Sequence, residues 1–270
     1  MSHPEIETAI PERGRPLADL FHENTKLNPV NDLDFAEGIT DVSRDREIVR
    51  DFASAAKSYP GHRRFPLRSG FSERGPSVFR TLRGRRTRRD FSGEPLPVDT
   101  LAAVLWYSAA ETGVMPAPTA PEIGHPLRAS PSAGALHSIE AYPVLFSTAG
   151  VPAGAYHYNV PEHALELLRD GDLRDLVAPL LLAPEMTPRA SGVLVLTAVL
   201  DRACLKYGER GYRFVHLDAG HLAQNVLLAC EALNAAAVPL GGFHDDGLAE
   251  VLELEARREI VIYPILLGLR

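Results

Sequence analysis

Arginine is concentrated in one short segment of this chain. Six of the ten residues from Arg80 to Arg89 are arginines. In an extended segment alternate side chains point to one side, so Arg85, Thr87 and Arg89 would present two guanidinium groups and a hydroxyl to one ligand. Because forked guanidinium groups suit phosphate and carboxylate, this spacing predicts an anion site. The alternative interpretation is a solvated basic face.

A turn of small residues stands within RASPSAGALHSIEAYPV, residues 128–144. The turn consists of Pro131, Ser132, Ala133 and Gly134. These residues are small enough for the backbone to approach a flat ligand closely, and they lead into a predicted strand. A turn of this composition before a strand is also ordinary in proteins, so by itself it is a weak signal.

Paired glycines occur in the segment AVPLGGFHDD, residues 237–246. Gly241 and Gly242 follow a predicted long helix and precede a second one. Paired glycines expose backbone N–H groups and allow a ligand to approach the chain closely. The alternative interpretation is a simple helix-to-helix turn.

These segments must be positioned by a mixture of helices and strands. Hydrophobic periodicity and the placement of glycine and proline predict helices over residues 97–110, 212–234 and 245–254, and strands over residues 141–146, 154–158, 164–168, 192–200 and 259–268. Strands and helices follow one another irregularly. This order predicts an α+β fold with a mixed β-sheet flanked by helices.

Two of these elements and one predicted loop carry more specific expectations. The strand at residues 192–200 is apolar throughout and is predicted to be central and buried on both faces. The helix at residues 212–234 is apolar on most sides, which predicts burial in a core or a subunit interface. Five prolines within residues 113–134 predict a long loop, and such a loop in a compact domain is more often functional than not.

Length and composition indicate one compact domain preceded by an arm. With 270 residues, 45% of them hydrophobic, the chain can bury one sizeable core. We expect residues 1–76 to form a partly extended N-terminal arm and residues 77–270 to form the compact domain. The net charge of −7 and the lack of a membrane-length apolar run or signal-peptide profile predict a cytoplasmic protein that binds neither nucleic acid nor membrane.

Two other kinds of site are weakly indicated. His216 and His221 lie five residues apart on a predicted helix and point in different directions, so no metal site is expected. If the arginine run bound nucleic acid, the binding would depend steeply on salt, and this is the weakest of the alternatives.

Taken together, the arginine segment, the turn at residues 131–134 and the paired glycines resemble, in order and spacing, motifs of the FMN-dependent nitroreductase superfamily. The chain is more closely similar to the SagB-type, or McbC-like, dehydrogenase branch, the azoline oxidases of ribosomal peptide biosynthesis. The resemblance covers about residues 77–268 and matches residues 1–76 more loosely. It implies a nitroreductase-like fold and an intertwined homodimer with two FMN sites at the subunit interface.

The resemblance also assigns roles to individual residues. It implies that Arg85 takes the FMN phosphate, that Thr87 supports the polar edge of the ring, and that Arg89 faces N1 and O2 of the isoalloxazine. A positive group at that place stabilises the anionic reduced flavin. The turn at residues 131–134 would pack on FMN from the partner subunit, and the paired glycines would lie near flavin N5. The implied cofactor-binding residues are Arg85, Arg86, Thr87, Arg89, Pro131, Ser132, Ala133, Gly134, Leu240, Gly241, Gly242 and Arg270.

The similarity to azoline oxidases depends on CLKYGERGYR, residues 204–213. Lys206 and Tyr207 match the Lys-Tyr pair that precedes a G-x-R-x-Y-R stretch in that branch. The resemblance implies that this pair is catalytic, with Lys206 taking a proton and Tyr207 orienting or relaying it. A lysine acts as a base only where burial or a nearby cation lowers its pKa. The alternative is a surface lysine beside a half-buried tyrosine.

Two departures from the family pattern limit what can be transferred. The usual nitroreductase places a C-terminal Lys or Arg on the flavin phosphate, so here either Arg270, Arg86 or Arg213 takes that role or the phosphate is held less tightly. Gly241 stands where simple nitroreductases commonly have glutamate, which weakens the assignment as an NAD(P)H-dependent nitroaromatic reductase.

The expected function is therefore oxidation of thiazoline or oxazoline rings to azoles in a peptide natural-product pathway. Lys206, Tyr207 and FMN would carry the reaction, and dioxygen or another acceptor would reoxidise the flavin. The expected partners are a second copy of the chain and a peptide substrate, with or without a cyclodehydratase. The alternatives are an NAD(P)H-dependent flavin or nitro-type reductase and a non-catalytic scaffold in a peptide-modifying complex.

Overall fold

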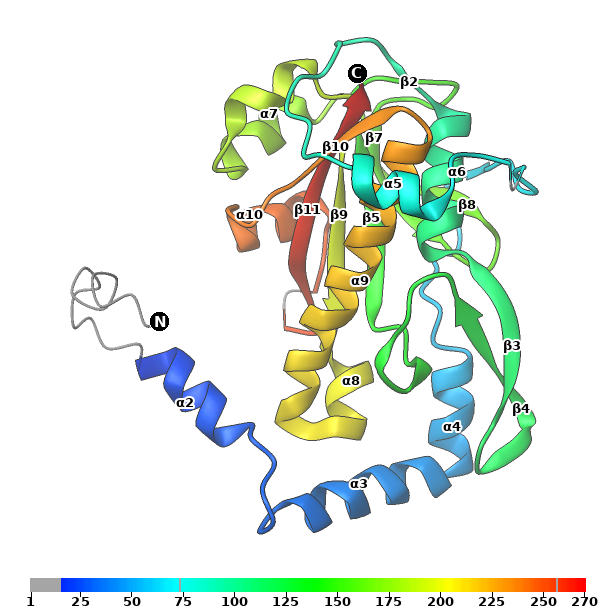
Figure 1. The fold of residues 1–270 in the computed structure, drawn as a ribbon, viewed down its shortest axis with the longest axis vertical. Helices are drawn as coiled ribbons and strands as arrows, with labels where there is room; N and C mark the ends of the chain where they lie inside the picture. Colours follow the sequence, from blue (N-terminus) through cyan, green and yellow to red (C-terminus); the bar gives the residue numbers. More distant parts are fainter. Residues whose placement is uncertain (1–15, 73, 256) are drawn as a thin grey trace.

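The computed structural model describes residues 16–72, 74–255 and 257–270 (Figure 1). Its main element is a seven-stranded sheet in the order β1-β8-β7-β5-β9-β11-β10, and neighbouring strands in it pair antiparallel. The strands are β1 (Arg64–Pro66), β5 (Ile139–Leu145), β7 (Gly154–Asn159), β8 (Ala164–Asp170), β9 (Gly192–Val199), β10 (Ala235–Pro239) and β11 (Glu259–Leu269). Parallel pairing occurs between β2 (Leu96–Pro97) and β6 (Thr148–Ala149), which form a separate small sheet.

Strand β9 lies inside the main sheet, between β5 and β11. Leu194 and Leu196 point into the core on one face, whereas Val193 and Val195 point into the core on the other. All four side chains are almost completely inaccessible to solvent. Because a strand covered on both faces has no polar side to present, its sequence reads as a continuous apolar run, and the predicted central strand is confirmed.

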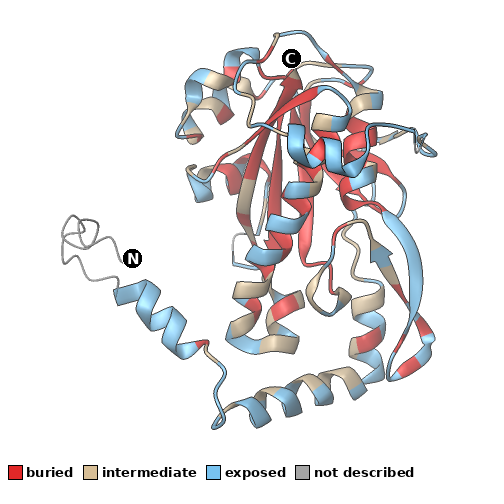
Figure 2. Cartoon of the chain, viewed as in Figure 1, coloured by how far each residue is buried: buried red, intermediate tan, exposed pale blue. Residues whose placement is uncertain are grey.

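Helices cover both faces of the main sheet, which makes the molecule α+β (Figures 1 and 2). On one face, α6 (Val98–Ala109) and α9 (Gly211–Ala232) bury apolar side chains against the strands, and α5 (Val78–Gly84) packs beside α9. On the other face lie α7 (Arg174–Val177) and α10 (Asp245–Val251). No helix in the described part of the chain is both long and apolar enough to cross a membrane.

The long helix predicted over residues 212–234 is present as α9. Its inner face packs on the sheet through Val215, Leu222 and Val226. Its outer face exposes Leu217 and His221. The single chain therefore leaves one side of this helix uncovered, and burial of that side against a second copy stays a prediction.

The prediction of a loop over residues 113–134 is wrong for most of that segment. Strands β3 (Glu111–Ala117) and β4 (Ala120–Arg128) form an antiparallel hairpin there. Pro116 and Pro126 lie within these strands, opposite Gly124 and Val114. The hairpin forms a sheet of its own with two strands, so each strand has a free edge at which the missing N–H of proline costs no ladder hydrogen bond.

Three helices fill much of the predicted N-terminal arm: α2 (Pro16–Asn24), α3 (Asp32–Arg44) and α4 (Arg46–Ala53). In Figure 1, α2 projects away from the body, while α3 and α4 run past α8 and the hairpin. Strand β1 also belongs to the predicted arm, and it joins the edge of the main sheet beside β8. Residues 1–15 of the predicted arm lie outside the described residues.

Candidate active site

The structure brings the turn at residues 131–134 against the Lys-Tyr pair. Lys206 and Tyr207 end helix α8 (Leu200–Tyr207), which follows β9 directly. The turn precedes β5, and β5 pairs antiparallel with β9 so that Ile139 faces Ala198. Because β5 starts where β9 ends, the turn and α8 emerge at the same end of the sheet.

Gly134 forms the contact between the two segments. Its φ of +61° is in the left-handed region, which favours glycine. A Cβ atom at this position would overlap the Tyr207 hydroxyl and lie 3.2 Å from the Lys206 Nζ. The absence of a side chain at Gly134 therefore allows the backbone of the turn to lie directly against the Lys-Tyr pair.

A buried carboxylate on α9 holds the turn in place. Asp218 is only 7% exposed and accepts hydrogen bonds from the Ser132 hydroxyl at 2.7 Å and the Ala133 amide at 3.2 Å. The Ser132 oxygen in turn accepts a 3.0 Å hydrogen bond from the amide of His137. Burial raises the pKa of Asp218, and the two hydrogen bonds it accepts oppose that effect. The turn is thus fixed by a side chain more than eighty residues away in the sequence.

Aromatic rings from two other elements enclose Tyr207. Phe35 of α3 stacks on it with ring centroids 6.3 Å apart, and Phe214 of α9 meets it edge-on at 4.9 Å. Burial, followed by the negative charge of Asp218, raises the pKa of Tyr207, so its hydroxyl keeps its proton. Burial lowers the pKa of the Lys206 ammonium, which makes the neutral amine easier to form.

Lys206 borders a cavity of about 400 Å³ between the arm, the hairpin and the turn. The lining residues are Ser43, Val49 and Phe52 of the arm; Met115, Ala117, Pro118, Thr119 and His125 of the hairpin; Ser132, Gly134, Ala135 and Leu136 of the turn and the residues after it; and Lys206. Most of these side chains are apolar. The cavity therefore combines an apolar wall with a cationic group whose pKa is lowered.

Helix α8 is anchored by Arg202, one turn before Lys206. The Arg202 guanidinium donates to the His137 carbonyl at 2.8 Å and to Glu140 Oε1 at 2.6 Å. Burial alone would raise the pKa of Glu140, but the hydrogen bond from His157 and the charge of Arg202 lower it to about 2. Arg202 thus ties the helix that carries Lys206 to the chain that follows the turn.

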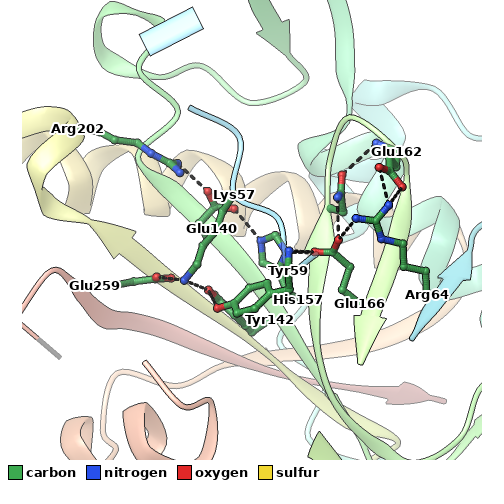
Figure 3. Close-up of polar contacts among 11 residues, drawn as sticks. Lys57, Tyr59, Arg64, Glu140, Tyr142, His157, Glu162, Glu166, Arg202 and Glu259 are labelled. Carbon is green, nitrogen blue, oxygen red and sulfur yellow. Dashed lines mark hydrogen bonds and ion pairs between the residues drawn. The ribbon is translucent and has the colours of Figure 1, made fainter. Parts of the chain in front are cut away.

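The anchor continues into a buried polar network on the other face of the sheet (Figure 3). The His157 ring lies between two carboxylates, with Nε2 3.1 Å from Glu140 and Nδ1 3.0 Å from Glu166. Glu166 also accepts a 3.0 Å hydrogen bond from the amide of Tyr59. Lys57 pairs with Glu259 and donates to the Tyr142 hydroxyl at 2.7 Å. The network therefore fastens the segment after α4 to four strands of the sheet.

The arginine segment lies elsewhere, beside the C-terminal end of α9. Arg85 and Thr87 are half-buried, whereas Arg86 and Arg89 are exposed. No hydrogen bond or ion pair joins the guanidinium group of Arg85 or Arg89 to a residue within the described ranges. The neighbouring Arg88 lies 3.6 Å from Glu231, a carboxylate that it shares with another arginine. Positive charge therefore exceeds negative charge at this place, which suits an anion.

That other arginine is Arg270. Its guanidinium pairs with Glu231 at 2.5 Å and donates to Asn234 Oδ1 and the Ala235 carbonyl at 3.0 Å each. Arg86 donates to backbone carbonyls within the arginine segment itself. Arg213, by contrast, lies near the start of α9 and binds Thr25 Oγ1 at 2.7 Å. Within one chain, the length of α9 separates Arg213 from the arginine segment, whereas Arg86 and Arg270 lie at that segment or beside it.

One chain does not bring the arginine segment to Lys206. Asp218, at the turn, and Glu231, at the arginine segment, are thirteen residues apart on α9. At 1.5 Å per residue the two places are separated by about 20 Å along the helix.

The paired glycines occupy a third place. Gly241 lines a separate cavity of about 370 Å³ beside Tyr212, His216 and Glu259. Gly242 packs against the Leu182 side chain, and its carbonyl accepts a 3.1 Å hydrogen bond from the Leu182 amide. The preceding Leu240 is buried and joins the sheet through Pro264. None of the three lines the cavity at Lys206.

Sequence reasoning missed several residues of this site. Asp218 carried a signal, because it is an acidic residue within an otherwise apolar stretch of the long helix. His125 was missed because its segment was predicted to be a loop rather than a strand. The arm residues Val49 and Phe52 carried no local signal, since only the packing of α4 against β4 brings them to Lys206.

Comparison with known proteins supports the same family. A model of the Nitroreductase family matches residues 82–268. A protein of Methanocaldococcus jannaschii named as a nitroreductase is 31% identical over 183 residues, covering 68% of this chain and 84% of its own. A crystal structure of a protein from Ralstonia eutropha, also named as a nitroreductase, is 26% identical to this chain and has a TM-score of 0.63. The match covers 79% of this chain and 92% of that one.

Two further relatives are named for the processing of peptides. The trifolitoxin-processing protein TfxB of Rhizobium leguminosarum is 34% identical over 148 residues, or 52% of this chain and 39% of that protein. The microcin B17-processing protein McbC of Escherichia coli is 28% identical over 144 residues, or 52% of this chain and 53% of that protein. The chain thus matches only about half, or less, of these two relatives. Its fold and the family match show that the chain belongs to the nitroreductase family and is similar within it to the McbC-like proteins.

Proposed function

We propose that the protein is an FMN-dependent dehydrogenase that oxidises azoline rings in a peptide to azoles. The observation that carries the proposal is the contact between Gly134 and the Lys206–Tyr207 pair at the edge of a cavity. A base with a lowered pKa, a protonated hydroxyl and a backbone turn without a side chain meet there. These are the groups that proton removal beside a flat cofactor requires.

The residues of the arginine segment fit the phosphate of FMN. Arg85 and Arg89 make no ion pair with described residues, and Arg88 and Arg270 share a single carboxylate. The turn at residues 131–134 fits the flat ring system, because its small residues allow a flat ligand to approach the backbone closely. Arg85, with Arg86 and Arg270 nearby, would hold the phosphate, and the turn would pack on the ring. Bound FMN would supply the hydride acceptor.

Two copies of the chain are needed to assemble one such site. Within one chain, about 20 Å of helix α9 separates the turn from the arginine segment. The exposed outer face of α9 would be covered by the second copy, as expected for a two-fold interface. Each FMN would then be held by the arginine segment of one copy and the turn of the other.

The chain's own residues divide the reaction between them. Lys206, as the neutral amine, takes the acidic proton from the azoline ring carbon next to the carbonyl. The Tyr207 hydroxyl lies beside the same turn, keeps its proton and orients or relays the proton that Lys206 receives. The hairpin and α4 line the cavity together with the turn.

Peptide substrates are supported by the names of two relatives, which process trifolitoxin and microcin B17. The proposed substrate is therefore a peptide that carries azoline rings, with or without a cyclodehydratase as partner. The similarity to a protein named as a nitroreductase favours one second candidate, an NAD(P)H-dependent reductase. Steady consumption of NAD(P)H without azoline would identify that activity.

The first experiment is the visible spectrum of the purified protein and of the supernatant after heat denaturation. We expect one FMN per chain, its loss in Arg85→Ala, and its retention in Arg80→Ala, a matched exposed arginine outside the assigned residues. Lys206→Ala should retain FMN and lose turnover of a thiazoline peptide. Protein without flavin that also fails to bind added FMN would contradict the proposal and favour the scaffold alternative.

A mixing experiment tests the shared site. Arg85→Ala and Lys206→Ala each disable a different component, so each homodimer should be inactive. Because the proposed site takes Arg85 from one copy and Lys206 from the other, a mixed dimer of the two variants should contain one intact site and one doubly substituted site. Mixing and refolding should therefore restore activity, and a mixture that stays inactive would show that Arg85 and Lys206 of one site come from the same chain.

A further inference from the structure

The cavity at Lys206 contains a second titratable side chain, His125. This residue comes from β4, opposite Met115 in the hairpin, and it is 8% exposed. Both residues line the cavity together with Lys206. No acidic residue lines the cavity within the described part of the chain. The polar end of the cavity is therefore formed by hydrogen-bond donors and bases.

The surroundings of His125 keep its ring neutral. Burial is the larger cause and the positive charge of Lys206 the second, and both lower the pKa of His125. A neutral imidazole carries one proton, on either Nδ1 or Nε2. At neutral pH His125 can therefore donate one hydrogen bond without adding a charge beside Lys206.

The position of that proton follows from what surrounds the ring. The Nδ1 atom is buried and has no hydrogen-bond partner among the described residues. A buried N–H without an acceptor is rarer and more costly than an acceptor that is not satisfied. The proton is thus favoured on Nε2, which makes no hydrogen bond to a described residue and is therefore available to a ligand in the cavity that His125 lines.

We propose that His125 donates a hydrogen bond from Nε2 to the carbonyl oxygen next to the ring carbon that loses its proton to Lys206. The inference rests on the proposed function and names a substrate class: azolines that carry a carboxamide on that carbon, flanked by an apolar group. When the C–H bond breaks, its proton goes to Lys206 and its electron pair is drawn toward the carbonyl oxygen. The pair then forms the new ring double bond as the neighbouring carbon gives up hydride to the acceptor named above.

The apolar wall of the cavity accounts for the flanking group. Val49 and Phe52 of α4 line the cavity of about 400 Å³ together with Met115 and Leu136. A hydrogen bond to a developing oxyanion is stronger in such surroundings than in water. The same wall that binds an apolar side chain therefore also strengthens the contact from His125.

Two small substrates separate this role from a structural one. The probes are 2-phenylthiazoline-4-carboxamide and 2-phenylthiazoline, which lacks the carbonyl. With wild-type protein, the carboxamide should react faster. In His125→Leu, kcat for the carboxamide should fall by about 100-fold, the loss typical of one oxyanion donor, while turnover of 2-phenylthiazoline changes little. His125→Gln, whose amide nitrogen can reach the position of Nε2, should recover much of kcat.

Binding of the product gives a readout that does not depend on turnover. In calorimetric titrations, 2-phenylthiazole-4-carboxamide should bind His125→Leu about three- to tenfold more weakly than wild type, as expected for loss of one hydrogen bond. His62→Gln is the matched control, because His62 is exposed and remote from the cavity lining. It should leave binding and both rates unchanged.

The outcomes distinguish this inference from the proposed function. If wild type oxidises the carboxamide and His125→Leu, folded and loaded with flavin, keeps the same kcat and affinity, the inference is overturned while the function stands. If wild type oxidises neither probe but binds the product in a way that depends on His125, the binding site stands and azoline oxidation fails. If wild type neither turns over nor binds these compounds, both fail. An equal loss on both probes would show that His125 acts on structure rather than on the carbonyl.

Discussion

The backbone of Gly134 lies directly against the side chain of Tyr207, with no room between them for a methyl group. The Lys206 ammonium nitrogen would be 3.2 Å from such a methyl group. Two segments more than seventy residues apart in the sequence thus meet without an intervening side chain. The position of the turn therefore determines the position of the Lys-Tyr pair.

A substitution at this contact tests its importance. In Gly134→Ala the new Cβ costs about 1–2 kcal/mol for the left-handed backbone and about 1–3 kcal/mol for overpacking against Tyr207. Gly61→Ala is the matched control, because Gly61 also has a positive φ, of +88°, but has open space around it. In urea denaturation Gly134→Ala should be less stable than Gly61→Ala, and only Gly134→Ala should lose activity. Equal losses in both variants would show that the contact has no effect.

The carboxylate of Asp218 is expected to stabilise the turn through its hydrogen bonds. Asp218→Ala leaves the Ser132 hydroxyl and the Ala133 amide without their acceptor, which should cost about 1–3 kcal/mol of unfolding free energy. Asp218→Asn keeps an acceptor oxygen and avoids burying a charge, so its loss should be smaller. Thermal unfolding measures both, with Asp41→Ala on the exposed side of α3 as control. If Asp218→Ala melts like wild type, Asp218 does not hold the turn.

The activity of Lys206 should depend on pH in a defined direction. As a general base Lys206 must be neutral, so kcat/KM should rise with pH as its ammonium loses a proton. Because burial lowers its pKa, the rise should be centred below the value of an ordinary lysine. Lys206→Arg should lack both the activity and the rise, because a guanidinium stays protonated. Lys26→Arg, remote from the cavity, is the control and should reproduce the wild-type pH profile of kcat/KM. If kcat/KM of the wild type does not change with pH, Lys206 is not the base.

The buried network predicts a loss of stability in acid. The folded-state pKa of Glu140 is lowered to about 2, so its stabilising effect is complete above the ordinary glutamate pKa of about 4.3. That effect is lost progressively as the pH falls from there towards 2. Glu140→Gln should cost about 3–5 kcal/mol at pH 7 by leaving Arg202 without its charged partner, and should flatten the acid dependence.

The matched control for Glu140 is Glu162→Gln, which removes an exposed carboxylate that pairs with Arg64. Surface pairs contribute little, so its melting curves between pH 7 and pH 3 should follow those of wild type. If Glu140→Gln keeps the full acid dependence of wild type, the pKa of Glu140 is not the cause of it.

Much of the fold could be read from local patterns. The alternation and apolar runs of β5, β7, β8, β9 and β11 identified these strands, because the burial of side chains on a sheet imposes a pattern on consecutive residues. The helices α6, α9 and α10 were identified because burial of a helix also leaves a pattern of apolar residues, with a different spacing. The hairpin of β3 and β4 was missed because proline is a strong signal against a strand, and only the free edges of a two-stranded sheet make it acceptable.

The sequence by itself determined the chemical groups of this protein: the arginine segment, the Pro-Ser-Ala-Gly turn and the Lys-Tyr pair, whose residue types and order can be read along the chain. The tertiary structure decided which of them meet. It joined the turn to Lys206 through Asp218, added His125 and α4 as the wall of a cavity, and left the arginine segment at the far end of α9. The physical reason is that these contacts depend on how helices and strands pack over long sequence separations, and local propensity contains no information about such packing.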